Sequence, residues 1–147
     1  MDAISLLKDD HRRVETLFQQ FEGEADVVRR GDVAGQIISE LTLHADAEEA
    51  WFYPRARHAT AGAERLTDEA LQEHRRVRQV IAQLESLRPE DDGYAPTMLR
   101  LKRLVQQHVQ AEENELFPEV STVVGQDELD AIGSRISEMK RASAPRG

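Results

Sequence analysis

The sequence predicts an all-α fold, an up-down-up-down four-helix bundle with a short extra C-terminal helix. Apolar residues recur at steps of three and four along five segments of the 147-residue chain, which places each set on one face of a helix. Short breaks rich in Gly, Pro or Asp separate the segments, and no segment alternates like a β-strand. Four such helices joined by short loops are typical of an antiparallel bundle.

The first two expected helices carry three polar residues in otherwise apolar stripes. His11 stands in the first stripe, and His44 and Glu48 stand in the second. The apolar members of the first stripe are Ile4, Leu7, Val14, Phe18 and Phe21, and those of the second are Ile37, Leu41 and Phe52. A break is expected at residues 23–31, and the second helix is expected to end near Pro54.

The next two expected helices repeat this arrangement. His74 interrupts the third stripe, and His108 and Glu112 interrupt the fourth, after a break at residues 89–96. The apolar members are Leu71, Val77, Ile81 and Leu84 in the third stripe, and Met98, Leu101 and Val105 in the fourth. A fifth stripe follows Gly125 and consists of Leu129, Ile132, Ile136 and Met139.

The expected organisation is one bundle over residues 1–122, a short helix over residues 126–141 and a flexible tail over residues 142–147. The chain has no cysteine, which excludes disulfides and thiolate metal sites. Its net charge of −9 argues against nucleic acid and anionic membranes as partners. No apolar run approaches the about 20 residues of a membrane span, and the acidic N-terminal segment is unlike a signal peptide. We therefore expect a cytoplasmic protein that is a monomer or a weak homodimer.

Four of the five histidines occupy corresponding points of the repeat, and a glutamate follows two of them by four residues. In a bundle of alternating direction, these side chains should share one layer of the core. A single histidine in a helical core needs no metal, but here six polar groups interrupt four stripes at matching depth. Burying two unpartnered carboxylates costs several kcal/mol each. The pattern therefore predicts a metal centre.

The donor atoms limit the choice of metal. Imidazole and carboxylate groups without sulfur suit iron, manganese or zinc. Four imidazoles and two bridging carboxylates supply about eight bonds, whereas two octahedral ions offer roughly twelve positions. A dinuclear, redox-active and coordinatively open centre fits best, whereas a single tetrahedral zinc would leave donors unused. No glutamate stands three residues before a histidine, which argues against a ferritin-like di-iron bundle.

The order His, His-x-x-x-Glu, His, His-x-x-x-Glu over about residues 1–120 resembles the hemerythrin family, specifically its single-domain bacterial branch. The acid pairs after the second and fourth histidines and the aromatic-Pro ends of both blocks belong to this resemblance. It implies a four-helix bundle around two iron ions with an oxo or hydroxo bridge. The terminal ligands that it implies are His11, His44, His74 and His108, and the bridging ligands are Glu48 and Glu112.

The chain departs from the oxygen-carrying hemerythrins at two places. They have a further histidine one turn after the third-helix histidine, where this chain has Arg78. They also end with His-x-x-x-x-Asp, where this chain has His108-x-x-x-Glu112. One iron is therefore expected to lack a ligand. Tyr53, whose counterpart is Phe117, is the first candidate to coordinate or contact that iron.

Tyr53 is also the expected catalytic residue. On a straight helix it would point away from the metal, but a residue before proline leaves the α region, and a loosened helix could turn the phenol inward. His58 is the second candidate for the vacant position, although an exposed loop histidine is the plainer interpretation. Glu15, one turn after the first histidine, is a further candidate ligand or acceptor. Glu49 and Glu113 are expected to orient imidazoles or to face solvent.

Three functions are compatible with such a centre. The first is an enzyme, a catalase-like or peroxidase-like di-iron oxidoreductase that acts on hydrogen peroxide, or a protein that reacts with nitric oxide, as the resemblance implies. The alternative is reversible binding or sensing of oxygen, nitric oxide or iron without turnover. In the third, the metal only braces the bundle. Oxygen, peroxide and nitric oxide all need the same open iron, so the sequence predicts a class of small ligand.

Overall fold

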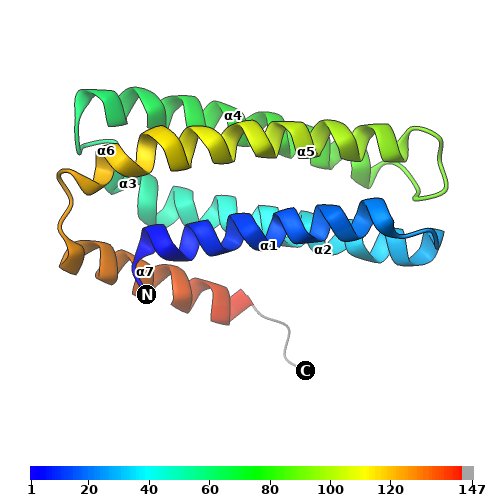
Figure 1. The fold of residues 1–147 in the computed structure, drawn as a ribbon, viewed down its shortest axis with the longest axis horizontal. Coiled ribbons are helices and arrows are strands. Elements are labelled where there is room, and N and C mark those ends of the chain that lie inside the picture. The colour runs from blue at the N-terminus through cyan, green and yellow to red at the C-terminus, as the bar shows by residue number, and fades with distance from the viewer. Residues whose placement is uncertain (144–147) are drawn as a thin grey trace.

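The computed structural model describes residues 1–143, and these residues contain helices and no strand. The long helices form two antiparallel hairpins, one above the other in Figure 1. They are α1 (Ala3–Gly23) with α2 (Val27–Ala47), and α4 (Ala61–Glu85) with α5 (Tyr94–Ala111). The predicted all-α bundle is therefore confirmed. Within the described residues, no helix is both long and apolar enough to cross a membrane.

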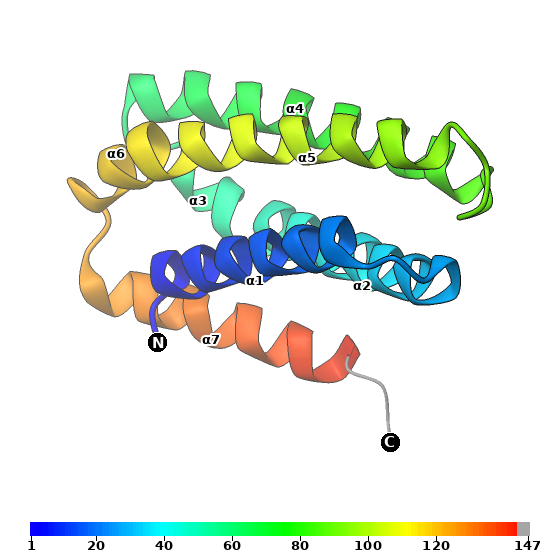
Figure 2. The same cartoon turned by 45° about the vertical axis from the view of Figure 1, so that its right-hand side comes forward.

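Short segments extend α2 and α5 at one end of the bundle. The segments η1 (Glu48–Phe52) and α3 (Tyr53–Ala56) follow α2 directly, and η2 (Glu112–Leu116) and α6 (Phe117–Ser121) follow α5. Helix α7 (Gln126–Ser143) packs against α1 and α2, on the side away from α4 and α5 (Figure 2). It ends beyond the predicted limit at residue 141, and residues 144–147 of the predicted tail lie outside the described residues.

Side-chain caps decide where three helices begin. The side chains of Asp2, Asp26 and Thr60 each accept a hydrogen bond from the backbone N–H three residues later, at 2.8, 3.1 and 2.9 Å. These bonds satisfy N–H groups that have no partner within the helix. Because Asp26 caps α2, that helix begins at Val27, well before the predicted break ends at Gly31.

The segments η1 and η2 are π-helical turns at corresponding places of the repeat. The N–H of Tyr53 donates to the carbonyl of Glu48, five residues earlier, and Phe117 donates to Glu112 in the same way. A proline directly follows each of these donors. Proline has no N–H, and its ring crowds the carbonyl of the preceding turn, so a wider turn eases both conflicts.

The apolar core has two halves, with a polar layer between them. The half near α7 includes Leu7, Phe52, Leu116, Phe117 and Ile136. The half toward the hairpin loops includes Val14, Phe18, Ile37, Leu84 and Leu101. On α1, the buried His11 falls between these halves.

Helix α7 lies so close to the start of α1 that one position requires glycine. A Cβ atom at Gly133 would lie 2.4 Å from the carbonyl oxygen of Met1 and 2.9 Å from the carbonyl carbon of Asp2. Ile136, on the next turn, is fully buried. This close packing fixes α7 beside the polar layer.

Candidate metal centre

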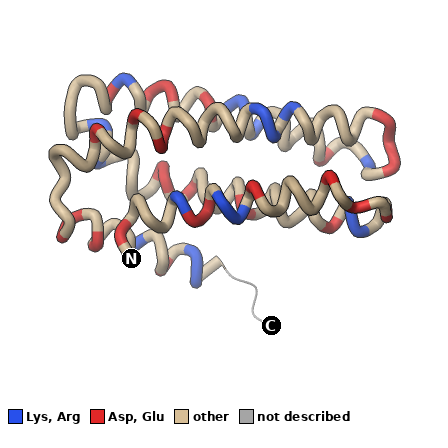
Figure 3. The backbone as a smooth tube through the Cα atoms, in the orientation of Figure 1, with Lys and Arg blue, Asp and Glu red and all other residues tan. Residues whose placement is uncertain are grey.

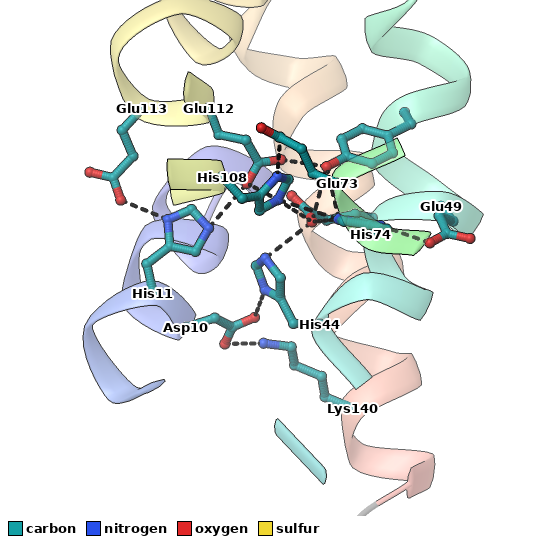
Figure 4. Close-up of polar contacts among 12 residues, drawn as sticks. Asp10, His11, His44, Glu49, Glu73, His74, His108, Glu112, Glu113 and Lys140 are labelled. Atoms are coloured by element: carbon teal, nitrogen blue, oxygen red, sulfur yellow. Dashed lines mark hydrogen bonds and ion pairs between the residues drawn. The ribbon is translucent and has the colours of Figure 1, made fainter. Parts of the chain in front are cut away.

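Four imidazoles and two carboxylates meet in one buried layer across the bundle (Figure 4). The imidazoles come from α1, α2, α4 and α5, and the carboxylates come from the first residues of η1 and η2. Each of the six residues is at most 8% exposed. They are His11, His44, His74, His108, Glu48 and Glu112. The structure thus brings together all six histidines and glutamates that the sequence singled out as ligands.

The Nε2 atoms of the imidazoles face the two carboxylates. Nε2 of His11 lies 3.1 Å from Oε1 of Glu112, and Nε2 of His108 lies 3.2 Å from the same oxygen. Glu48 has an equivalent pair of neighbours. Its Oε1 lies 3.1 Å from Nε2 of His74 on α4 and 3.2 Å from Nε2 of His44 on α2. Each carboxylate therefore faces one imidazole from each hairpin.

The donor atoms fall into two groups, each with its atoms within 4.8 Å of one another. The first group is His11, His44, Glu48 and Glu112, and the second is Glu48, His74 and His108. Glu48 belongs to both groups, as a carboxylate that bridges two ions would. The arrangement therefore accommodates two adjoining metal positions.

The outward-facing Nδ1 atoms of two histidines bind acids from the neighbouring helix. Nδ1 of His44 lies 2.8 Å from Asp10, and Nδ1 of His108 lies 2.8 Å from Glu73. Neither acid was predicted from the sequence as part of the site. The signal was present, because each stands directly before the first histidine of its repeat. An acid at that place reaches the other helix of its own hairpin.

The remaining two histidines bind acids from the opposite hairpin. Nδ1 of His11 lies 2.6 Å from Glu113, and Nδ1 of His74 lies 2.7 Å from Glu49. Of the two roles expected for these glutamates, orienting an imidazole is the one that the geometry supports. When Nδ1–H donates to a carboxylate, the lone pair of the ring stands on Nε2, which is then the atom available to bind a metal.

The residues of this layer fit a cation at its centre. The Nε2 atoms of His74 and His108 face each other at 3.3 Å, and with both Nδ1 atoms donating, two lone pairs meet unless a proton or metal ion lies between them. Nε2 of His44 is 3.2 Å from Glu48 without hydrogen-bond alignment, and Oε2 of Glu48 is buried without a partner. Such nitrogen and oxygen donors suit iron, manganese or zinc. The cluster could therefore bind metal.

Burial and neighbouring charges control ionisation in the layer. Burial lowers the pKa of His44, but the Glu48 carboxylate and the hydrogen bond to Asp10 outweigh it and raise the pKa to about 10. Burial opposes ionisation of Glu48, yet the charge of His44 holds the pKa of this carboxyl well below its ordinary value. A metal ion competes with these protons for the same nitrogen atoms. The layer is therefore built to hold positive charge.

The Tyr53 hydroxyl reaches into the layer. It donates to Oε2 of Glu112 at 2.6 Å and lies 3.2 Å from both Oε1 of Glu48 and Nε2 of His74. Burial and the charges of the two glutamates raise the pKa of Tyr53 well above its ordinary value. The phenol oxygen thus lies among the candidate ligand atoms.

The π turn places the Tyr53 side chain in the layer. The expectation that Pro54 would move Tyr53 out of the α region was wrong. Tyr53 keeps α-helical angles, φ −63° and ψ −35°, so Pro54 does not force it out of the α region. Tyr53 follows His44 by nine residues, so on a straight α-helix the two side chains would point roughly 180° apart around the axis. The π turn absorbs one extra residue, which reduces this angle to roughly 80°. At the equivalent position after η2, Phe117 stacks on His11 at 6.1 Å with 4° between the rings.

Two other candidates lie outside the layer. His58 is exposed, in the turn between α3 and α4, and Glu15 is exposed on α1. Neither belongs to the two groups of buried donor atoms. Arg78, at the position of the missing histidine, instead donates to Glu49 at 2.7 Å and to Asp46 at 3.0 Å. It therefore supports the acid that orients an imidazole.

Helix α7 adds a lysine to these outer contacts. Nζ of Lys140 contacts Oδ1 of Asp10 (Figure 4), and Arg13 lies 3.3 Å from the same oxygen. Burial opposes ionisation of Asp10, but His44 and Lys140 lower the pKa of its carboxyl. The carboxylate therefore stays ionised and accepts the imidazole N–H.

A small cavity lies against the histidine rings. Its volume is about 30 Å³, and the four imidazoles share its walls with apolar side chains, among them Val14, Leu41, Val77 and Val105. Roughly 10–15 Å³ of such space is enough to hold one water molecule, so the cavity has room for a very small molecule. Only molecules of a few atoms fit beside the layer.

Comparisons with known proteins agree with this geometry. The family model described as the hemerythrin HHE cation binding domain matches residues 2–120. The fold is similar to the crystal structure of a hemerythrin HHE cation binding domain-containing protein from Mycobacterium kansasii. That likeness has a TM-score of 0.82 and 24% identity, and it covers 96% of this chain and 86% of that chain.

Two curated relatives are longer than the chain. The chain is 26% identical over 140 residues to a DNA nickase of Nostoc sp.. That match covers 95% of this chain and 39% of the nickase. It is 20% identical over 133 residues to an uncharacterised hemerythrin-like protein of Schizosaccharomyces pombe. That match covers 90% of this chain and 66% of the yeast protein. The chain therefore spans less than two thirds of either relative.

Proposed function

Because this chain belongs to the hemerythrin HHE cation-binding domain family, we propose that it is a non-haem di-iron protein that reacts with small oxygen or nitrogen species. Hydrogen peroxide, in a catalase-like or peroxidase-like reaction, is the first candidate, and nitric oxide is the second. When bound, two irons supply redox chemistry and open coordination positions. The proposed ligands are His11, His44, His74, His108, Glu48 and Glu112, with Tyr53 coordinating or contacting one iron.

One observation carries the proposal: the layer of donor atoms adjoins a cavity of about 30 Å³. A larger substrate needs a larger pocket, and a metal that only braces the bundle needs no space at its side. Carboxylates already orient all four imidazoles, at 2.6 to 2.8 Å. A centre that is preorganised in this way supports reaction with molecules of a few atoms.

Tyr53 supplies a proton donor at the site. Its hydroxyl donates to Glu112 at 2.6 Å, and its raised pKa keeps the proton on the phenol at neutral pH. Disproportionation of two peroxide molecules gives two waters and one dioxygen, so protons must move from one peroxide to the other. The phenol oxygen and the Glu112 carboxylate are the pair that we propose to hold and pass them.

Metal content and peroxide turnover test the proposal together. Protein expressed in iron-replete medium is expected to hold about two irons per chain. It should release oxygen from peroxide faster than the same amount of free iron does. One zinc per chain, or a folded protein without metal, would overturn the di-iron proposal. Two irons without oxygen release would leave the centre standing and remove the catalase-like activity.

Reversible binding of oxygen or nitric oxide is the alternative, because the same cavity and the same oriented imidazoles favour it. A visible spectrum that changes and recovers as oxygen is cycled would favour binding over turnover. Iron that responds to neither azide nor peroxide would instead indicate a bracing metal.

DNA nicking, the activity in the name of the Nostoc relative, is a weaker candidate for this chain. A net charge of −9 opposes contact with a phosphate backbone. Figure 3 shows acidic and basic residues interspersed along the described helices. Conversion of supercoiled plasmid to open circle by the metal-loaded chain would support DNA nicking as its activity.

A further inference from the structure

A groove between α1 and α5 reaches the metal layer from the surface. Its volume is about 410 Å³, and both His11 and its partner Glu113 line it. The two helices lie on the near side of Figure 1, one from each hairpin. The groove therefore follows the seam where the two hairpins meet.

Three valines separate this groove from the small cavity at the histidine rings. Val14, Val105 and Val109 line both spaces, beside His11, which also borders both. Val14 and Val105 are 3% and 8% exposed, whereas Val109 is half-buried at the groove. Side-chain motions are fast on the scale of ligand binding, so such a thin wall can open for a few atoms. A charged solute would lose its hydration in crossing it, which favours neutral molecules.

The opposite seam, between α2 and α4, is bridged. Arg78 on α4 donates to Glu49 at 2.7 Å and to Asp46 at 3.0 Å. In the repeat, Glu15 occupies the position of Arg78, four residues after the histidine, and Glu113 occupies that of Glu49. Two carboxylates cannot form the equivalent ion pair because their charges repel. This exchange of charge leaves the α1–α5 seam without that bridge beside the metal layer. The ion pair that does cross this seam joins Lys102 to Glu22, near the end of α1 that leads into the hairpin loop.

We propose that neutral molecules of a few atoms, such as oxygen, nitric oxide and hydrogen peroxide, reach the iron through the α1–α5 seam. Val14, Val105 and Val109 form the gate, and Glu15 keeps the seam open. This inference rests on the proposed function, since it concerns the same metal layer. It assigns the selection of small neutral ligands to residues that bind no metal.

Rates of nitric oxide binding to the reduced, iron-loaded protein test the gate. The substitution Val109→Phe is expected to slow binding about tenfold, at unchanged iron content and final spectrum. The half-buried position gives the larger ring room in the groove. The matched control is Leu104→Phe, on the same helix but among the lining residues of neither space, and it should keep the wild-type rate.

A charge exchange tests the seam. The substitution Glu15→Arg places a cation opposite Glu113 and is expected to bridge the α1–α5 seam and slow binding. Glu15 is exposed, so this substitution leaves the core intact. Wild-type rates in both Val109→Phe and Glu15→Arg would overturn the proposed route.

Xenon-pressurised crystals of the wild-type protein separate this route from the proposed function. Xenon is a neutral probe that needs no iron, and we expect it in the small cavity and in the groove between α1 and α5. Xenon between α2 and α4 instead would overturn the route. Xenon in the expected places, with no spectral response of the iron-loaded protein to peroxide, nitric oxide or oxygen, would overturn the proposed function and leave the route standing.

Discussion

Each histidine of the metal layer uses its two ring nitrogens for different contacts. Nδ1 donates outward to a carboxylate, at 2.6 to 2.8 Å, and Nε2 faces the centre. The tautomer is assigned from this hydrogen-bond pattern. Because the outer carboxylate also fixes the plane of the ring, the lone pair is aimed before metal binds. The outer acids therefore belong to the site as much as the ligands do.

Removing the charge of Asp10 is expected to weaken metal binding. In Asp10→Asn, His44 loses the carboxylate that orients and polarises it, and such losses reduce affinity by about 10- to 100-fold. Iron content after dialysis against graded chelator measures the change. Asp9→Asn is the control, since the Asp9 side chain is 52% exposed and pairs with Arg12. Equal losses in both variants would contradict the role of Asp10.

Removing the Tyr53 hydroxyl is expected to change chemistry more than binding. In Tyr53→Phe, the iron content should stay the same, the ferric visible spectrum should change, and peroxide turnover should fall by about 100-fold as the proton position is lost. Tyr94→Phe is the matched control, because Tyr94 is the only other tyrosine and lies beside Phe21, toward the hairpin loops. An unchanged ferric spectrum in Tyr53→Phe would refute contact with iron.

At the scale of elements, the two π turns give the two halves different chemistry on similar backbones. The first turn directs Tyr53 toward Glu112, and the second stacks Phe117 on His11 at 6.1 Å. One side of the centre therefore meets a phenol oxygen, and the other meets an apolar ring. The asymmetry comes from one hydroxyl group, because both turns share the same hydrogen-bond shift.

Docking of α7 on α1 predicts a strong effect at one glycine. In Gly133→Ala, the new methyl group would lie 2.4 Å from a backbone oxygen of Met1, so the two segments must separate. We expect the free energy of unfolding to fall by about 1–3 kcal/mol, measured by denaturant or thermal melts.

Gly35→Ala is the matched control for this substitution. Gly35 lies on an exposed face of α2 with nothing within 4 Å of its added Cβ. Alanine there should raise the free energy of unfolding by about 0.5–1 kcal/mol through helix propensity. Stabilisation in both variants would show that α7 does not pack on α1 as described.

At the scale of the whole molecule, protons and metal compete for one charged layer between two apolar halves. In the metal-free protein, the pKa of His44 rises from 6.5 to about 10. Its stabilisation is therefore complete below pH 6.5 and is lost as the pH rises toward 10. The pKa of Glu48 is lowered from 4.5, so its stabilisation is present above pH 4.5 and is lost as the pH falls.

Metal-free protein should therefore be most stable between pH 4.5 and 6.5. Metal binding releases the imidazole protons and strengthens as the pH rises. The gap in Tm between metal-loaded and chelator-treated protein should thus widen from about pH 6 to about pH 9. Melts at both values measure it, and a gap that narrows would contradict the competition.

Local pattern was enough to predict the helices and the six residues that share the layer. Helical periodicity places His11 on the face that carries Leu7 and Val14, and matching intervals bring equivalent residues to the same depth. The acids before the first and third histidines were equally visible as a repeat. Their partners were not, because those lie on the neighbouring helix of each hairpin.

The sequence by itself determined the helical bundle, the family resemblance and the set of six donor residues, because periodicity and spacing are properties of the chain alone. Only the tertiary structure decided that Tyr53 reaches the layer while His58 stays outside. It also decided that Lys140 supports Asp10 from α7. These outcomes depend on a one-residue shift of helical hydrogen bonds and on contacts between distant helices, which no local pattern specifies.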